Sequence, residues 1–262
     1  MRSIDSQFIS SCLNSNDFKN LFRKEDTTVH FVDWHSIKDR LEAVKSSFPA
    51  DALHTVAIKS NPLTHVLRSI NGFGFGLEAA SFEETKHAVS VGCSIICWDS
   101  PAKTELEIED IASNHPEVFI NSNSLKEATH LSRLKVKNPI LLRINPEYAG
   151  TAHQSMSVGT KHSKFGEPIS NRAQIIENLV NHESIVGLHV HTSSQTQNFE
   201  ELIESIRDVI DLANEIGSSR KIPLKWINIG GGFPVDYSGT EKFKISDYAD
   251  LLRSNCPELF DG

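Results

Sequence analysis

The stretch His54-Thr55-Val56-Ala57-Ile58-Lys59-Ser60-Asn61-Pro62 decides the fold prediction. A run of apolar and β-branched residues leads into Lys59, and Asn61-Pro62 follows directly. That pattern predicts a buried strand that ends in a turn. A lysine at such a strand end has two readings. It either extends its amine to solvent along an apolar stem, or it is a nucleophile that binds a carbonyl compound as a Schiff base.

Length and charge limit the classes of protein to which the chain can belong. Its 262 residues are enough for one α/β barrel, and its net charge of -8 argues against nucleic acid or an anionic membrane as partner. No apolar run approaches the roughly 20 residues of a spanning helix, and the polar first 24 residues do not resemble a targeting segment. The cysteines lack zinc-ligand spacing, which favours a reducing cytoplasm. They are Cys12, Cys93, Cys97 and Cys256.

Strands and helices are predicted to alternate along the chain. Predicted strands cover residues 28–34, 54–59, 75–80, 94–98, 118–121, 139–145, 184–191 and 224–229. Predicted helices cover residues 36–48, 63–70, 102–112, 124–134, 173–180, 199–216 and 245–252, and another opens at residue 81. Near-continuous hydrophobic strands are typical of a buried parallel sheet, so the predicted fold class is α/β. Residues 1–27 are predicted to be an N-terminal arm and residues 28–262 one barrel domain, with a functional loop at 147–168.

Chemically useful side chains gather at the predicted strand ends. Five residues lie at or just after the C-terminal end of a predicted strand: Lys59, Glu78, Arg143, His191 and Gly230. In a parallel barrel those ends share one face, where catalytic loops lie; a doubly wound sheet would need a switch point. The convergence predicts a site on that face.

A glycine turn follows the last predicted strand. In Gly230-Gly231-Gly232 the backbone N–H groups can approach an anion without obstruction by side chains, and Ser194 offers a hydroxyl to the same anion. The turn is neither a dinucleotide fingerprint nor a P-loop. The histidine spacing predicts no metal site. Glu84 has a structural reading, because Ser81-x-x-Glu84 fits a capping box, as does Ser124-x-x-Glu127.

Taken together, the motifs resemble the fold-type III pyridoxal-phosphate decarboxylases that act on diaminopimelate, ornithine and arginine. The matching segments are residues 57–62 (AIKSNP), 76–84 (GLEAASFEE), 142–146 (LRINP), 163–166 (SKFG), 187–195 (GLHVHTSSQ) and 229–234 (IGGGFP). The resemblance implies a (β/α)8 TIM-like barrel of the alanine racemase and decarboxylase type. It also implies pyridoxal 5'-phosphate as cofactor and α-decarboxylation of a basic or diamino acid.

The resemblance assigns roles to individual residues. Lys59 is expected to be the Schiff-base lysine, and His191 is expected to stack on the pyridine ring. The phosphate is expected to bind to Ser194 and to the turn formed by Gly230, Gly231 and Gly232. Glu78, Glu84 and Arg143 are expected to give polar support around the ring and the lysine. Gln195 and the loop at 150–166 are more similar to the diaminopimelate branch than to the ornithine branch.

The chain also departs from the family pattern. Glu78 and Asn228 stand where the family commonly has aspartate, and Thr192-Ser193 where it usually has an apolar residue and glycine. The family's eighth barrel strand, with a Glu-x-Gly-Arg motif, and a C-terminal β-domain would follow residue 262, and the family places the strand at 28–34 in that other domain. We therefore expect an incomplete, seven-stranded barrel that is inactive by itself, from a parent that forms a homodimer.

Other functions remain open at this stage. An ornithine or arginine decarboxylase has the same barrel. Alanine racemase shares the lysine-first barrel, but its Ala-Asn-Ala-Tyr-Gly continuation is missing after Lys59. The single-barrel pyridoxal-phosphate-binding protein lacks the GLHVH and GGGFP motifs. A regulatory pseudoenzyme is a further alternative, against which the presence of Lys59 argues. The sequence beyond residue 262 would discriminate among these.

Overall fold

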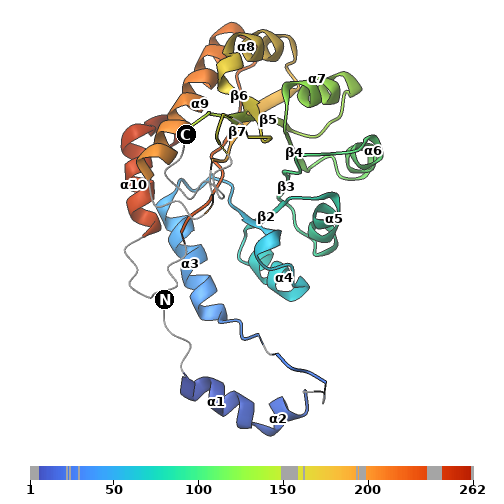
Figure 1. Cartoon of the computed structure of the whole chain (residues 1–262), viewed down its shortest axis with the longest axis vertical. Coiled ribbons are helices and arrows are strands. Elements are labelled where there is room, and N and C mark those ends of the chain that lie inside the picture. The colour runs from blue at the N-terminus through green and yellow to red at the C-terminus, as the bar shows by residue number, and fades with distance from the viewer. Residues whose placement is uncertain are drawn as a thin grey trace.

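The computed structural model describes residues 6–21, 23, 25–28, 30–148, 159–161, 163–192, 194, 199–234 and 244–260. Within them a curved parallel sheet has helices along its outer side (Figure 1). The strands are β1 (Thr55–Ala57), β2 (Gly76–Ala79), β3 (Ile96–Trp98), β4 (Phe119–Ser122), β5 (Ile140–Asn145), β6 (Glu167–Pro168), β7 (Ile185–Val190) and β8 (Trp226–Asn228). Their order is β1-β2-β3-β4-β5-β7-β8, and the short β6 pairs with β5.

The sheet is an open α/β barrel in the part of the chain that the structure describes. Every pairing is parallel, and β1 and β8 lie at the two ends of the order without pairing to each other. The predicted seven-stranded barrel is therefore confirmed for these residues. Helices α3 (Trp34–Ser47), α4 (Thr64–Gly72), α5 (Phe82–Ser90), α6 (Glu105–Asn114), α7 (Leu125–Leu134), α8 (Arg172–Asn181), α9 (Phe199–Ser219) and α10 (Ile245–Asn255) connect or flank the strands.

Alternation along the strands gives the sheet an apolar outer face and a polar inner face. The outward residues form the buried core against the helices; they include Leu77, Ile96, Trp98, Ile120, Ile140, Leu142 and Leu188. The register places the intervening residues side by side on the other face; they include Glu78, Cys97, Asn121, Arg143, His189 and Asn228. Polar groups inside the barrel thus form a band below the catalytic end predicted from the sequence.

Aromatic rings fill the inner face near the strand starts. Phe119 begins β4, and its ring meets that of Trp226 at the start of β8 edge to face, with centroids 5.4 Å apart. Since two strands separate β4 from β8 in the sheet, this contact spans the barrel. Side chains therefore close the lower interior, as in other packed barrels, and leave the opposite end for chemistry.

The strand predicted at residues 28–34 is wrong for the residues that the structure describes. Residues 30–33 lie in no strand, and Trp34 begins α3. The reason is a helix cap: the Asp33 carboxylate accepts hydrogen bonds from the backbone N–H groups of His35 and Ser36 at 3.0 and 3.2 Å. The strand predicted through Lys59 is also too long, because β1 ends at Ala57 and residues 58–60 form a 3₁₀ turn.

Each of the two predicted capping boxes forms only one of its two expected hydrogen bonds. The Ser81 hydroxyl accepts from the Glu84 N–H at 3.2 Å, as expected for an N-cap, but the Glu84 carboxylate accepts from the Ala80 N–H at 2.7 Å. Ser124 and Glu127 repeat this pattern, with the carboxylate reaching one residue before the cap. A fully reciprocal box instead starts α6, between Thr104 and Glu107.

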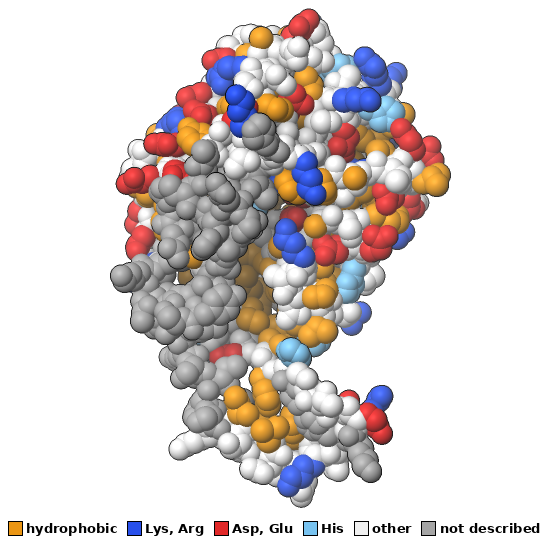
Figure 2. All heavy atoms as spheres, in the orientation of Figure 1, with side chains coloured by type: hydrophobic (Ala, Val, Ile, Leu, Met, Phe, Trp, Pro, Cys, Tyr) orange, Lys and Arg blue, Asp and Glu red, His pale blue; other side chains and the backbone are white. Residues whose placement is uncertain are grey.

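The arm before the barrel contains α1 (Ser6–Asn14) and α2 (Asn16–Lys19), which lie apart from the sheet (Figure 1). Phe18 stacks on Phe31 with ring centroids 5.9 Å apart, which fixes α2 against the chain that leads to α3. Hydrophobic side chains gather on this part of the surface (Figure 2), where Leu21 is 76% exposed. Among the described helices, none is long and apolar enough to cross a bilayer.

Candidate active site

Lys59 lies at the end of β1, in a tight turn whose geometry is local. The Ser60 hydroxyl donates to the Ala57 carbonyl at 2.7 Å, and the Asn61 N–H donates to the Ile58 carbonyl at 3.0 Å. Ile58 is fully buried and anchors the turn, whereas Lys59 is exposed. The turn therefore holds the lysine at the rim of the barrel, on the face predicted from the sequence.

A carboxylate that the sequence analysis did not single out occupies the centre of this face. Asp99 directly follows β3, and its carboxylate accepts a 3.4 Å hydrogen bond from Nη1 of Arg143 on β5. Its other oxygen lies 3.6 Å from Nε2 of His189 on β7. Burial alone would raise the pKa of Asp99, but His189 and Arg143 outweigh burial and hold that pKa below its usual range. Asp99 is thus a buried, ionised carboxylate.

Arg143 is fixed on three sides. Besides Asp99, its guanidinium donates to the His191 carbonyl at 3.5 Å and lies over the Phe165 ring, 4.8 Å from the centroid. Only 5% of Arg143 is exposed. Phe165 belongs to the SKFG motif, so this cation–π contact explains how that segment joins the site. The predicted supporting position of Arg143 near the site is consistent with these contacts.

His191 follows β7, and the glycine turn holds its ring. The Gly231 N–H donates to Nδ1 of His191 at 3.3 Å, so Nδ1 is an acceptor and any proton on the neutral ring is on Nε2. Burial, together with the positive charges of His189 and Arg143, lowers the pKa of His191 to about 4 against the weaker opposing effect of Asp99. The imidazole is therefore neutral at pH 7, which suits it to pack against a ring.

The turn after β8 requires glycine at Gly230. Its φ of +71° is unfavourable for other residues, and a Cβ there would lie 2.4 Å from the Val190 carbonyl oxygen. A Cβ on Gly231 would meet nothing within 4 Å. The Gly230 N–H donates to the Asn228 side-chain oxygen at 2.9 Å. The Gly230 and Gly231 N–H groups both have protein acceptors, whereas the described residues provide no acceptor for the Gly232 N–H.

Glu78 differs from Asp99 in its surroundings. Burial and the nearby negative charge of Asp99 raise its pKa, while Lys59 and His189 oppose the rise. Glu84 accepts the Ala80 N–H and stabilises the start of α5, and its expected support of the ring or the lysine stays a prediction. The structure thus places Glu78 among the site residues and gives Glu84 a capping role.

The sequence analysis missed Lys103, whose side chain is fully buried. Its amine lies 2.8 Å from the Glu127 carboxylate and donates to the carbonyls of Ser100 and Asn121 at 2.7 Å each. It thereby ties the loop after β3 to the end of β4. Both polar side-chain atoms of Asn121 are buried without a hydrogen-bond partner among the described residues.

Some predicted features lie outside the described residues. They are Ser193, Gln195 and the loop at 149–158. Ser194 is described and exposed, but its expected contact with a phosphate stays a prediction. No cluster of three or more histidine, cysteine or carboxylate side chains able to hold a metal occurs in the described part of the chain.

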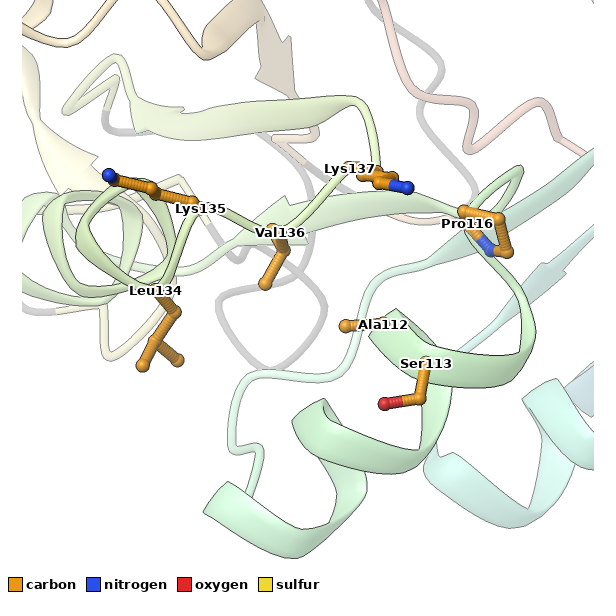
Figure 3. A pocket seen from close by; sticks show the side chains of 7 residues that line it. All are labelled: Ala112, Ser113, Pro116, Leu134, Lys135, Val136 and Lys137. Atoms are coloured by element: carbon orange, nitrogen blue, oxygen red, sulfur yellow. The ribbon is translucent and has the colours of Figure 1, made fainter.

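A surface pocket with a volume of ≈ 470 Å³ lies elsewhere in the molecule (Figure 3). Residues from the C-terminal ends of α6 and α7 line it, including Ala112, Leu134 and Val136. Those helix ends precede β4 and β5, so the pocket lies at the starts of the strands, opposite the face that holds Lys59. It has no role in the site.

Comparison with known proteins identifies the family of the chain. Residues 34–262 match the family described as "Pyridoxal-dependent decarboxylase, pyridoxal binding domain". The chain belongs to this family. Pyridoxal phosphate is the cofactor of these pyridoxal-dependent decarboxylases, as the motifs implied. The fold agrees, because solved structures of fold-type III decarboxylases superimpose on the open barrel.

Several relatives of this chain are diaminopimelate decarboxylases. The Aquifex aeolicus enzyme is 29% identical, and the match covers 90% of this chain and 57% of that enzyme. A Helicobacter pylori enzyme is 28% identical, and the match covers 93% of this chain and 62% of that enzyme. The crystal structure of the H. pylori enzyme with L-lysine matches with a TM-score of 0.78 and 25% identity, covering 94% of this chain and 63% of that one. The chain thus spans about 60% of the length of these relatives.

The residues of this decarboxylase-family chain fit the cofactor. The exposed Lys59 amine lies at the barrel rim, and the ring of His191 is neutral. Gly230 packs tightly on the Val190 carbonyl, whereas a Cβ on Gly231 would meet nothing within 4 Å, so the backbone at Gly231 is open to an approaching phosphate. These three features occur on three separate strand ends and meet on one face of the barrel.

Proposed function

We propose that the protein takes part in pyridoxal-phosphate-dependent α-decarboxylation of a basic or diamino acid, with diaminopimelate as the first candidate. One observation carries the proposal. Five strand ends each place one site residue on the catalytic face of the barrel, and these residues are Lys59, Asp99, Arg143, His191 and Gly230. The names of the first relatives, all diaminopimelate decarboxylases, support the choice of substrate.

Each residue has a role that its position supports. The Lys59 amine would hold the carbonyl group of the cofactor. The neutral His191 ring, held in orientation by the Gly231 N–H, would pack against the cofactor. The Gly232 N–H and the Ser194 hydroxyl would bind the phosphate, and the open surface at Gly231 would leave room for its approach.

Pyridoxal phosphate, when bound, supplies an electron sink for cleavage of the bond between the α-carbon and the carboxylate. The protein's contribution is to orient that bond, to keep the positions of Arg143 and His191 fixed, and to supply protons. The contacts of Arg143 with Asp99, Phe165 and the His191 carbonyl provide the rigidity that such orientation requires.

The substrate could be another basic amino acid. A lysine/ornithine decarboxylase from Vibrio vulnificus, solved with putrescine, matches with a TM-score of 0.73 at 21% identity, which concerns the fold alone. A non-catalytic, pyridoxal-phosphate-binding or regulatory protein of the same fold would share the cofactor site but would not release CO2. Soluble location in the cytoplasm and a homodimeric parent enzyme belong to the same proposal.

We also propose that protein outside these 262 residues completes the catalytic centre. In the described residues β1 and β8 are free sheet edges, whereas a closed barrel pairs every strand. The carboxylate that faces the pyridine nitrogen in this family, and the residues that recognise the distal end of the substrate, are expected from that additional protein.

The test is an assay of CO2 release. Residues 1–262 are supplied with pyridoxal phosphate and then with diaminopimelate, ornithine, arginine or lysine. We expect cofactor binding without turnover. A rate of about 1–1000 per second would contradict the incompleteness of the centre and would support decarboxylation directly. A longer natural protein that contains this chain should release CO2 from one of the four substrates; release from none would overturn the proposed function.

A further inference from the structure

Two carboxylates lie side by side on the inner face of the barrel, and their partners differ. Glu78 pairs in register with Cys97, and Asp99 comes two residues after Cys97, so both side chains belong to the same face of adjacent strands. Asp99 has Arg143 at 3.4 Å and His189 at 3.6 Å. Glu78 has neither a hydrogen bond nor an ion pair with any described residue. Of the two acids, Asp99 therefore has the short contacts to Arg143 and His189.

From this arrangement we propose that Asp99 is a positioning residue whose charge favours the protonated form of Glu78, and that Glu78 is the proton relay for the Lys59 amine. The inference rests on the proposed function, because the relay serves the exchange of Lys59 for a substrate amine. Two acids whose surroundings favour opposite protonation states are a recurrent arrangement for acid–base chemistry.

The charges around Glu78 come from four other elements. Asp99 after β3 and Glu84 on α5 disfavour a charge on Glu78, as does burial, which is the largest effect. Lys59 after β1 and His189 on β7 favour the charge. The net result is a raised pKa for Glu78, because His189 is already engaged by Asp99 and the Lys59 amine is exposed to water.

The position of Glu78 suits it to act on Lys59. Glu78 pairs in register with Ala57, two residues before Lys59, so the acid and the lysine lie at neighbouring strand ends. The charge of Lys59 also acts on the Glu78 carboxyl. Glu78 thus lies on the strand next to the one that carries the lysine.

The proposed relay takes up as many protons as it gives away. When a substrate amine takes the place of Lys59 at the carbonyl carbon, the bond from that carbon to the Lys59 nitrogen breaks and the bond to the substrate nitrogen forms. The Lys59 nitrogen gains protons and the substrate ammonium loses the same number. Glu78 gives its proton to Lys59 and takes one from the substrate ammonium, so it ends the exchange as it began, and no redox partner is needed.

The first experiment uses the full chain without cofactor, so it does not depend on the proposed function. Carboxyl titrations are followed by carbon-13 NMR, with the Glu78 signal assigned by its loss in Glu78→Gln. We expect Glu78 to titrate above the ordinary glutamate range and to move downward in Asp99→Asn. An ordinary titration of Glu78, or one that Asp99→Asn leaves unchanged, would overturn the proposal.

The second experiment measures exchange at Lys59 in the full chain loaded with pyridoxal phosphate, using methylamine or lysine as the incoming amine and absorbance as the signal. Glu78→Gln should slow the exchange about 10²–10⁴-fold, the usual contribution of a general acid or base, and Glu78→Asp should restore part of it. Asp99→Asn should shift the falling, alkaline limb of the rate profile to lower pH, because Glu78 then stays protonated only at lower pH.

The control is Glu83→Gln, which changes an exposed glutamate on α5 and should leave the exchange rate unaltered. An exchange rate that Glu78→Gln does not change would overturn the relay. If the cofactor fails to react at Lys59 at all, the proposed function is wrong, whereas the titration coupling of Glu78 and Asp99 is still measured independently.

Discussion

The backbone N–H of Gly231 donates a hydrogen bond to Nδ1 of His191 over 3.3 Å. This contact joins the loops after β7 and β8 and fixes the orientation of the imidazole. Because the N–H occupies the Nδ1 lone pair, and because burial and nearby cations disfavour a charge, the ring stays neutral near pH 7. The backbone donor therefore sets the direction of the ring that faces the proposed cofactor, and burial with the neighbouring charges keeps it neutral.

Loss of His191 should change how stability depends on pH. Its pKa is lowered from 6.5 to about 4 in the fold, so the unfolded chain binds more protons between these values and stability rises with pH across that window. The window corresponds to about 3 kcal/mol at most. We expect chemical denaturation of His191→Gln to show a flatter rise of the unfolding free energy between pH 4 and 6.5. His30→Gln, at an exposed position, should keep the wild-type slope.

Gly230→Ala should destabilise the protein and weaken cofactor binding. A left-handed backbone costs a residue with a side chain about 1–2 kcal/mol, and the Cβ would also collide with the Val190 carbonyl. Thermal unfolding and a cofactor titration measure the two effects. Gly231→Ala is the matched variant, since its Cβ would meet nothing within 4 Å; equal losses of stability in both variants would refute the steric argument.

Lys103 should be essential for stability because its fully buried amine is paired with Glu127. Lys103→Met leaves that carboxylate without its cation and should cost about 3–5 kcal/mol of unfolding free energy. The double variant Lys103→Met/Glu127→Gln removes the uncompensated charge and should be less destabilised than the single variant. A double variant that is the less stable of the two would show that the ion pair is not the cause.

Ser194→Ala tests the phosphate contact. Removing a hydrogen bond to a charged group should weaken cofactor binding by about 1–3 kcal/mol, measured as the dissociation constant for pyridoxal phosphate. Ser113→Ala serves as control, because Ser113 lines the pocket on the far side of the barrel (Figure 3). An unchanged dissociation constant for Ser194→Ala would remove this serine from the proposed site.

The sequence predicted the barrel and most of the site because both follow from strand periodicity. Residues at strand ends must share a face once the sheet is parallel, so the positions of Lys59, Arg143 and His191 could be inferred together. Asp99 satisfies the same rule, since it follows the strand predicted at 94–98. It was missed because it belongs to none of the motifs that carried the family resemblance.

Other features depend on contacts that periodicity does not encode. The apolar pattern around Phe31 and Trp34 is typical of a strand, yet the Asp33 carboxylate caps a helix at that point. The stacking of Arg143 on Phe165 and the burial of Lys103 join segments that are distant in the sequence. Such pairs become visible only when the strand ends are brought together in three dimensions.

The central claim is that Lys59 is the amine that binds the cofactor. The direct measurement is borohydride reduction of the full chain mixed with pyridoxal phosphate, followed by peptide mapping in a mass spectrometer. We predict the pyridoxyl mass on Lys59, and its loss in Lys59→Ala, with unmodified peptides for the exposed lysines Lys135 and Lys137 on the opposite face. A pyridoxyl group found on another lysine, with Lys59 unmodified, would contradict the account.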